Sequence, residues 1–312
     1  MKPTIFIDGK EGTTGLQIYE RLAGRTDLEL LLIDEDKRKD PAERKKCLNA
    51  ADLAILCLPD AAAAEAADMI ENPATRVIDA STAHRTAEGW VYGFAELRPG
   101  QRQRIQRAGR VANPGCHATG FLAAAAPLAE MGVLPADYPM TCYSLTGYSG
   151  GGKKMIAEYE APDRDPLLAS PAPYATGLKH KHLPEMQKLA GLKYPPVFLP
   201  VLGDISQGMA TSILLHNHLL RGKPTARDIY DLLCGYYEGQ QLIRMAPYGG
   251  TGPRLYTGAL AGTDCLEITV SGHEEQTLVT ARFDNLGKGA SGAAVQNMNL
   301  MLGFPETEGL SL

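Results

Sequence analysis

The sequence predicts an α/β protein that begins with a doubly wound parallel sheet. Over the first third of the chain, short apolar segments alternate with segments of helical length, which is typical of a parallel sheet covered by helices. A glycine-rich turn follows the first apolar segment, and beyond residue 140 the pattern changes to alternating apolar and polar residues. Since 312 residues exceed one comfortable core, we expect two domains.

The first domain is predicted to contain five strands, at residues 4–8, 28–33, 52–58, 76–80 and 110–112, with an alanine-rich helix at 60–70. In such sheets, ligands bind at the carboxyl ends of the strands. Ser81 and Arg85 follow the fourth strand and Cys116 follows the fifth. We therefore expect these three residues to share one cleft.

The glycine-rich turn, Gly9-Lys-Glu-Gly12-Thr-Thr-Gly15, joins the first strand to a segment with helical periodicity. Such a turn lets backbone N–H groups approach a pyrophosphate at the helix N-terminus. Residues 1–115 are accordingly expected to bind a dinucleotide. The spacing departs from the commoner Gly-x-Gly-x-x-Gly, and a plain tight turn is the alternative.

A charged run, Asp34-Glu-Asp-Lys37-Arg38-Lys39, follows the second strand. An acidic residue about twenty positions after the glycines favours a free ribose 2′-hydroxyl, whereas the basic trio favours a 2′-phosphate. These residues alone leave NAD, NADP and a solvated charge run open.

The turn Asn113-Pro114-Gly115 places Cys116 at the N-terminus of an apolar helix. Unpaired N–H groups and the positive dipole end favour a thiolate there and can hold an oxyanion. We therefore expect a reductase that works through an enzyme thioester. The alternative is that Cys116 is a small buried hydrophobe, as most free cysteines are.

A second group of candidate residues follows a long loop at 161–173, whose length indicates a function. Beyond it stand Tyr174, His180, His182 and Glu185. Because no third ligand lies at the usual spacing, we expect no metal. A histidine serving as acid or base for the cysteine, with a carboxylate such as Glu185 orienting its ring, is the preferred interpretation over surface histidines.

The remaining sequence predicts an α+β pattern. A strand at 140–146 leads into a flexible glycine turn, Ser149 to Gly152, with anion-binding character. Thr225 and Asp228 predict a capping box, and the tail from Asp284 predicts a glycine-led helix. Further strands are expected at residues 211–219, which carry His216 and His218 as structural residues, and at 265–271 and 277–283.

Composition excludes several classes of partner. The formal net charge of −5 at pH 7 argues against nucleic acid or an anionic membrane. The longest apolar stretch, at 121–131, is broken by Pro127 and Glu130 and is too short to span a bilayer.

Asp8 and Lys10 interrupt the early apolar run that a signal peptide would need. The six cysteines lie far apart, so we expect no disulfide framework and a cytoplasmic setting.

Three widely spaced segments together resemble one family. They are Ala-Asn-Pro-Gly-Cys116, Tyr174 with His180-x-His182-x-Pro-Glu185, and Asp284-Asn-Leu-x-Lys288-Gly-Ala with Val-Gln296-Asn297-Met-Asn. The chain resembles the short form of N-acetyl-gamma-glutamyl-phosphate reductase of arginine biosynthesis, over residues 9–303. The first glycine turn and the segment Ala80-Ser-Thr-Ala-His84-Arg85 depart from the family pattern.

The resemblance implies the fold of aspartate-semialdehyde dehydrogenase. Residues 1–115 would form the dinucleotide-binding domain, residues 116–288 an α+β catalytic and oligomerisation domain, and residues 289–312 a C-terminal helix that returns to the first domain. The resemblance also implies a homo-oligomer, either a dimer or a tetramer, and NADP(H) as the cofactor, with Lys37 and Arg38 as ligands of its 2′-phosphate.

Roles for individual residues follow from the same resemblance. Cys116 is the nucleophile, and the residues lining the active site with it are Tyr174, His180, His182 and Glu185. Apart from the resemblance, Ser81 and Asn113 are expected beside a small acyl-phosphate substrate. The cofactor is expected to contact Gly9, Gly12, Thr13, Thr14, Gly15, Ser149, Gly150, Gly151 and Asn297.

The expected reaction has two halves. The Cys116 thiolate displaces phosphate from N-acetyl-L-glutamyl 5-phosphate, and hydride from NADPH then reduces the thioester to the semialdehyde while a histidine supplies a proton. Arg85 is the candidate for holding the phosphate, with a surface ion pair as its alternative. Two other functions stay open: reduction of another acyl phosphate, aspartyl or aminoadipyl, and a catalytically idle NADP-binding regulator.

Overall fold

The structure, a computed structural model, describes residues 2–250 and 252–312 and divides into two compact units. Unit 1 comprises the chain up to Ala95, Gly100–Pro114 and Ala290–Leu310. Unit 2 comprises Glu96–Pro99, Gly115–Gly289 and Ser311–Leu312. Among the described residues, no helix combines the length and apolar character needed to cross a membrane.

Unit 1 contains a parallel sheet with strand order β2-β1-β3-β4-β6-β5. Its strands are β1 (Thr4–Asp8), β2 (Glu29–Leu31), β3 (Leu53–Leu56), β4 (Arg76–Asp79), β5 (Val91–Tyr92) and β6 (Arg110–Ala112). Its helices are α1 (Thr13–Ala23), α2 (Pro41–Ala50), α3 (Asp60–Asp68), α4 (Gln101–Arg107) and α9 (Gly292–Leu302), with a 3-10 turn at Glu35–Lys37. The predicted strands are present, although β2, β3 and β4 are shorter than expected, and β5 was not predicted.

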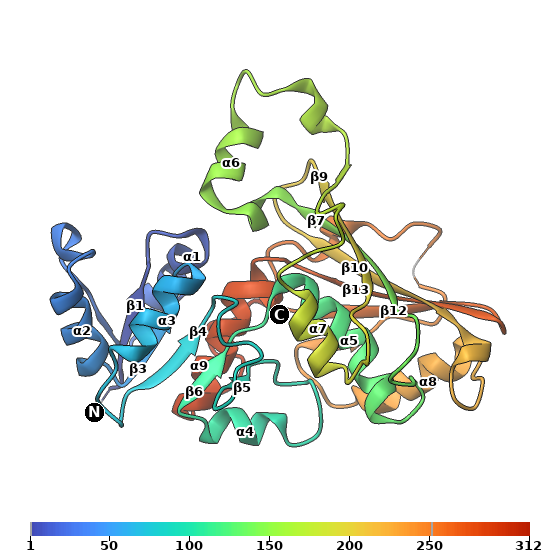
Figure 1. The fold of residues 1–312 in the computed structure, drawn as a ribbon, viewed down its shortest axis with the longest axis horizontal. Coiled ribbons are helices and arrows are strands. Elements are labelled where there is room, and N and C mark those ends of the chain that lie inside the picture. The colour runs from blue at the N-terminus through green and yellow to red at the C-terminus, as the bar shows by residue number, and fades with distance from the viewer. Residues whose placement is uncertain (1, 251) are drawn as a thin grey trace. The chain divides into compact units, whose positions relative to one another are not determined.

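Helices cover both faces of this sheet. Ile5 and Ile7 of β1 pack with Ile18 of α1 and Met298 of α9 in one apolar cluster. Phe6, the residue between them, points to the opposite face and joins a second cluster with residues of α2 and α3. This alternation along β1 confirms the predicted doubly wound arrangement, which Figure 1 shows around β1, β3 and β4.

Unit 2 is built on a mixed sheet with strand order β11-β12-β13-β10-β7-β9-β8. Its strands are β7 (Thr141–Gly147), β8 (Ala172–Pro173), β9 (Val197–Gly203), β10 (Met209–His216), β11 (Ile243–Met245), β12 (Leu266–Gly272) and β13 (Gln276–Phe283). Its helices are α5 (Cys116–Glu130), α6 (Gly152–Glu160), α7 (Leu183–Leu189) and α8 (Ala226–Tyr236). Short 3-10 turns lie at Tyr148–Gly151, Pro166–Ala169, Asn217–Leu219 and Thr257–Leu260.

Most of the strands and helices predicted beyond residue 200 are present. The strands predicted at 265–271 and 277–283 are confirmed and form the antiparallel pair β12 and β13, and Thr225 with Asp228 forms the predicted capping box of α8. The placement of His218 in a strand was wrong, because β10 ends at His216 and a 3-10 turn follows. The predicted tail helix is preceded by a π-helical turn, Gly287–Ser291.

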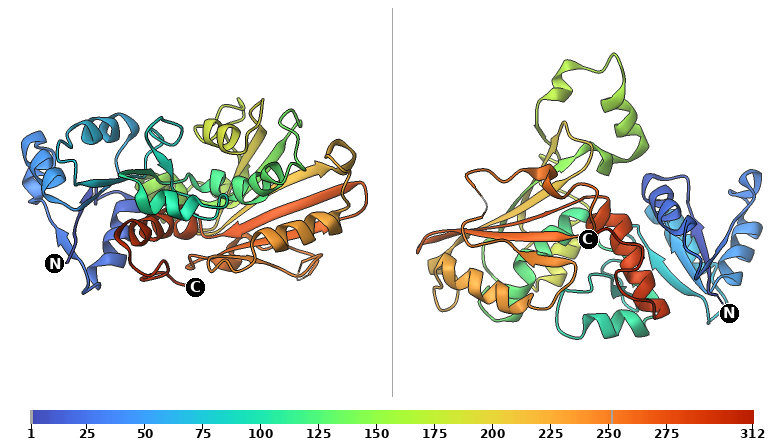
Figure 2. Two further views of the ribbon diagram at one scale, coloured as in Figure 1. Left: turned by 90° about the horizontal axis from the view of Figure 1, so that it is seen from below. Right: turned by 180° about the vertical axis from the view of Figure 1, so that it is seen from behind.

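Three helices lie on or near one face of the unit 2 sheet. Helix α5 contacts β10 and β13, α8 contacts β12 and β13, and α7 packs against α5. The segment that contains α6 stands away from the strands, as Figure 1 and the right-hand view of Figure 2 show in green. The other sheet face carries exposed side chains, including Tyr143, Leu199 and Leu214.

Close packing of α5 on the sheet depends on Gly120. A Cβ atom added there would lie 2.6 Å from the side chain of Thr211 in β10 and 2.9 Å from the Phe283 ring. Real Cβ atoms do not approach neighbours so closely, so this helix sits nearer the sheet than any other residue type would allow.

We expect Gly120→Ala to reduce the free energy of unfolding by about 1–3 kcal/mol, because the added methyl group overpacks the contact with Thr211. Urea denaturation of purified protein measures this. Gly235→Ala is the matched control, since Gly235 is also helical, is exposed and has open space at its Cβ position. The control should be neutral or slightly stabilising through helix propensity, and equal stability of Gly120→Ala and wild type would contradict this view of the packing.

Candidate active site

Cys116 is the first residue of α5, as predicted, and follows the N-cap residue Gly115. The N-cap residue itself has no side chain to cap the helix, and the Cys116 side chain is partly exposed. The backbone N–H of Gly115 donates a hydrogen bond to Oε2 of Glu185 at 3.2 Å. Gly289, in the π-helical turn, packs against Cys116: a Cβ atom at this glycine would lie 3.0 Å from Cβ of the cysteine. Any larger residue at position 289 would therefore crowd Cys116.

Aromatic rings gather beside this helix start. The ring of His117 lies 5.3 Å from that of His180 and 5.6 Å from that of His182, centroid to centroid. The rings of His180 and His182 are 4.7 Å apart, and the Tyr174 ring is 6.1 Å from His180. Unit 2 therefore brings together all the catalytic candidates that the sequence predicted.

His117 forms hydrogen bonds through both ring nitrogens. Nδ1 lies 2.8 Å from Oγ of Ser144, and Nε2 lies 2.8 Å from the hydroxyl of Tyr174. Burial, followed by the charges of His180 and Lys181, lowers the pKa of His117 to about 3. The imidazole is consequently neutral at physiological pH.

Tyr174 is linked electrostatically to the cysteine. Burial raises the pKa of its phenol well above the ordinary value, and the negative charge of Cys116 adds to the shift. The phenol is therefore a neutral hydrogen-bond donor at any working pH, and it lies within electrostatic reach of the sulfur.

The loop that carries the two histidines is held in an unusual backbone conformation. Ala175 (φ 51°) and Leu178 (φ 55°) both adopt left-handed geometry without being glycine, a conformation that is found disproportionately at functional sites. The backbone N–H of His182 donates to Nδ1 of His180 at 3.1 Å. Nδ1 is thus an acceptor, and the mobile proton of a neutral His180 lies on Nε2.

The predicted glycine turn after β7 adopts a 3-10 conformation. Ser149 is buried, and its Oγ accepts a hydrogen bond from Nδ2 of Asn285 at 3.0 Å. Gly150 and Gly151 continue this turn into α6. These residues belong to unit 2, like the cysteine.

In unit 1, the first glycine turn has the geometry of an anion cradle. Gly9 has a φ of 86°, and a Cβ there would lie 2.4 Å from the carbonyl oxygen of Cys57. Gly12 is the N-cap of α1 without a side-chain cap, and Thr14 follows within the first turn. Oγ1 of Thr13 is buried and has no hydrogen-bond partner among the described residues. A pyrophosphate fits this cradle, because it would accept hydrogen bonds from these groups.

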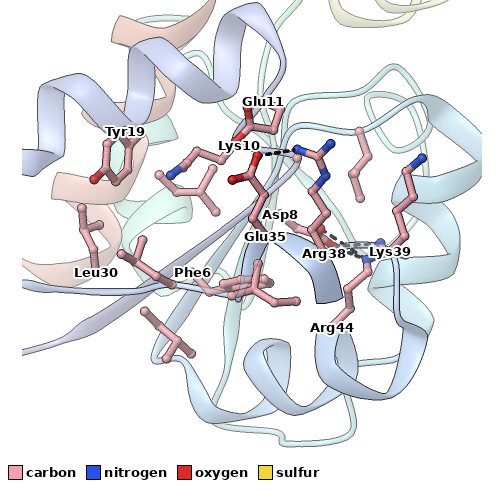
Figure 3. Close-up of a pocket in the computed structure, with 16 residues that line it drawn as sticks. Phe6, Asp8, Lys10, Glu11, Tyr19, Leu30, Glu35, Arg38, Lys39 and Arg44 are labelled. Carbon is pink, nitrogen blue, oxygen red and sulfur yellow. Dashed lines mark hydrogen bonds and ion pairs between the residues drawn. The ribbon is translucent and has the colours of Figure 1, made fainter.

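A cavity of about 580 Å³ adjoins that turn. Its lining includes Gly9, the end of β2, and the side chains of Arg38 and Lys39 (Figure 3). Lys37 does not line it; its ammonium lies 3.3 Å from Asp34, and this hydrogen bond raises the pKa of Lys37. The structure thus brings Arg38 to the cavity together with Lys39, a member of the basic trio that the resemblance did not name as a ligand.

The remaining predicted residues meet in unit 1, past β4 and β6. Nε of Arg85 donates to the carbonyl oxygen of Asn113 at 3.0 Å, and Oγ of Ser81 donates to Asp79 at 2.8 Å. Nδ2 of Asn297 donates to the Asn113 amide oxygen at 3.1 Å. Oδ1 of Asn297 is buried without a partner among the described residues and so suits an external N–H donor. That Ser81 and Arg85 share a cleft with Cys116 stays a prediction.

Comparisons with known proteins match the whole chain. A family described as semialdehyde dehydrogenase, NAD binding domain, matches residues 5–105, and one described as semialdehyde dehydrogenase, dimerisation domain, matches residues 116–285. N-acetyl-gamma-glutamyl-phosphate reductase 2 of Nostoc sp. is 48% identical over 320 residues, covering 99% of each chain. N-acetyl-gamma-glutamyl-phosphate reductase of Brucella ovis is 48% identical over 97% of this chain and 100% of that protein. The chain belongs to the N-acetyl-gamma-glutamyl-phosphate reductase family.

Solved structures share the fold of this N-acetyl-gamma-glutamyl-phosphate reductase family member. Aspartate semialdehyde dehydrogenase II of Vibrio cholerae has a TM-score of 0.73 at 18% identity, covering 97% of this chain and 98% of that chain. Aspartate semialdehyde dehydrogenase of Candida albicans, solved with NADP, has a TM-score of 0.66 at 15% identity, covering 97% and 99%.

The sequence analysis missed one residue of this site, His117. It stands inside an apolar helix, where a lone histidine resembles a core residue, and no spacing rule links it to Ser144 or Tyr174. Its position directly after Cys116 is the one sequence feature that points to it.

Proposed function

We propose that this chain reduces N-acetyl-L-glutamyl 5-phosphate to N-acetyl-L-glutamate 5-semialdehyde and phosphate with NADPH, as a cytoplasmic enzyme of arginine biosynthesis. The full-length similarity to relatives of that name supports the substrate. The observation that carries the chemistry is Cys116 at the start of α5, beside Tyr174 and two histidines. We propose that residues 1–115 bind the dinucleotide, 116–288 perform catalysis and assembly, and 289–312 return to the first domain.

In the first half-reaction, the Cys116 thiolate forms a bond to the acyl carbon. The bond from that carbon to the phosphate oxygen breaks, phosphate leaves, and a thioester remains. N–H groups at the start of α5 stabilise the oxyanion that forms in between. Arg85 binds the leaving phosphate, and its bonds to the carbonyl oxygens of Asn113 and Ala80 fix the plane of its guanidinium group. Ser81 and Asn113 border the substrate.

The second half-reaction reduces the thioester carbon with a hydride that bound NADPH would supply. A histidine donates its proton to the resulting oxygen and takes it back as the carbon–oxygen double bond re-forms, the carbon–sulfur bond breaks and Cys116 leaves as a thiolate. His180 is the preferred donor, because its Nδ1 accepts a backbone N–H and the donating proton of the ring therefore lies on Nε2. His182 and Glu185 complete the site.

The function is tested by assaying phosphate-dependent NADP reduction with three semialdehydes: N-acetylglutamate, aspartate and aminoadipate types. We expect the N-acetylglutamate semialdehyde to give the highest kcat/KM, by at least about a hundredfold, as differential binding of the acyl chain would produce. Preference for another semialdehyde would reassign the substrate, and no turnover with any of them would indicate an idle regulator.

Cys116→Ala supplies the control in the same assay. We expect it to abolish turnover while NADPH binding is unchanged, because only the covalent step is removed. Residual activity within about tenfold of wild type would exclude the sulfur from the mechanism.

For the cofactor, we propose NADP(H), with its pyrophosphate on Gly9, Gly12, Thr13, Thr14 and Gly15 and its nicotinamide near Ser149, Gly150, Gly151 and Asn297. Arg38 and Lys39 line the cavity beside that turn and would contact the 2′-phosphate. Lys37 is paired with Asp34 and would contribute less than Arg38 and Lys39 to binding the 2′-phosphate.

Lys39→Ala is expected to raise KM for NADPH about tenfold, the loss of one charge-assisted hydrogen bond, and to leave KM for NADH unchanged. Lys37→Ala is the matched control with the same change in net charge. Initial-rate kinetics with both cofactors measure the effect. Equal effects of the two substitutions would show that general electrostatic attraction, rather than a contact from Lys39, is responsible.

We further propose a homo-oligomer, a dimer or a tetramer, assembled through the exposed face of the unit 2 sheet. Tyr143 and Leu199 are neighbours on β7 and β9, and Leu214 follows on β10. They are 41%, 37% and 52% exposed, respectively, although apolar patches of this kind are usually covered. The similarity of residues 116–285 to a dimerisation domain supports a second copy of this chain as the partner.

Leu214→Glu combined with Tyr143→Glu is expected to convert the oligomer to monomers, because each copy would bury two charges at the contact. Sedimentation velocity at micromolar protein measures the mass. Leu167→Glu, at a residue 77% exposed outside the sheet, serves as the control and should not change it. A monomeric wild-type protein would refute the proposal.

A further inference from the structure

Four side chains form a continuous hydrogen-bonded chain from the unit 2 sheet to the Tyr174 hydroxyl. Oγ1 of Thr211 lies 2.8 Å from Oγ of Ser144, which lies 2.8 Å from Nδ1 of His117. Nε2 of His117 lies 2.8 Å from the hydroxyl of Tyr174. Thr211 and Ser144 are directly paired across β10 and β7. The chain thus joins the sheet, helix α5 and the histidine loop.

The direction of these hydrogen bonds is fixed by counting protons. A neutral His117 has one N–H donor and one acceptor nitrogen, so all the bonds must point the same way. If Tyr174 donated to His117, then His117 would donate to Ser144 and Ser144 to Thr211. The Thr211 hydroxyl proton would then need another acceptor, and none is present among the described residues. Because Thr211 is fully buried, its hydroxyl donor would then have neither a protein acceptor nor water as a partner, which costs free energy.

The opposite direction satisfies every buried proton. Thr211 donates to Ser144, Ser144 donates to Nδ1 of His117, and Nε2–H donates to the Tyr174 oxygen. The Tyr174 proton then lies at the end of the chain, where the side chain is partly exposed. Because this proton is not used within the chain, Tyr174 can donate it to another acceptor, and the negative charge of Cys116 acts on the same phenol.

We propose that His117, as its Nε2–H tautomer, is a positioning residue that fixes the Tyr174 hydroxyl as a hydrogen-bond donor to the acyl oxygen at Cys116. Tyr174 then shares with the N–H groups of α5 the stabilisation of the oxyanion. The role of Tyr174 as a donor to the acyl oxygen rests on the proposed function. The Nε2–H tautomer of His117 follows from the hydrogen bonds alone and does not depend on that function.

The tautomer is tested first, by two-bond ¹H–¹⁵N correlation spectra of protein labelled in its histidines. The His117 signals are identified by their absence in His117→Gln. We expect Nδ1 to be unprotonated and Nε2 protonated, without titration between pH 5 and pH 8. A protonated Nδ1, or a ring that titrates in this range, overturns the proposal.

Kinetics then separate positioning from folding. We expect His117→Phe and Tyr174→Phe each to lower kcat by about a hundredfold, the usual effect of losing one oxyanion donor, with KM changed less than about twofold. The double variant should lose no more than either single one, because the two residues act as a unit. His117→Gln, whose amide nitrogen can replace Nε2–H, should recover most of the activity.

Ser144→Ala and Ser212→Ala form a matched control pair. Ser212 makes a 2.8 Å hydroxyl contact with Thr280 in the same sheet, but its contacts do not lead to His117. We expect Ser144→Ala to lower kcat and Ser212→Ala to leave it unchanged. Additive losses from His117→Phe and Tyr174→Phe, or equal effects of both serine variants, overturn the role. If the wild-type enzyme does not reduce N-acetylglutamyl phosphate, the proposed function fails, and the tautomer is still decided by the spectra.

Discussion

The close contact between helix α5 and the sheet of unit 2 is the constraint on which the site depends. Gly120 lets the helix approach until its backbone nearly touches Thr211. The same Thr211 side chain contacts Ser144, so the packing of the helix and the hydrogen bonds beneath it share one residue. At the helix start, the carboxylate of Glu185 accepts a hydrogen bond from the backbone N–H of Gly115. The position of Cys116 is therefore set by two contacts near the start of α5, one just before the cysteine and one in the following turn.

The two units contribute different chemistry. Unit 1 supplies glycines and basic side chains around a cavity, a combination that favours anions. Unit 2 supplies a cysteine beside the Tyr174 phenol and three histidines, and burial keeps His117 uncharged. A buried neutral imidazole can donate and accept at fixed positions, whereas a charged one would lose its acceptor. Orientation rather than proton transfer is thus the property that burial gives this residue.

Much of the fold follows from local sequence, and much of the site does not. The parallel sheet, the start of α5 at Cys116 and the capping box at Thr225 were predictable because periodicity and turn residues lie within a few positions. His117 was not, since its partners Ser144 and Tyr174 are 27 and 57 residues away. The choice between neighbouring lysines after β2 likewise depends on backbone direction, which composition does not reveal.

The placement of α9 has a consequence for how the protein is made. Its Val295, Met298 and Met301 belong to the same apolar cluster as Ile5 and Ile18 near the start of the chain. During translation, the N-terminal strands emerge long before the helix that completes their core, so their apolar surface stays exposed until α9 has been synthesised. An intermediate that lacks α9 therefore exposes apolar surface that is prone to aggregation.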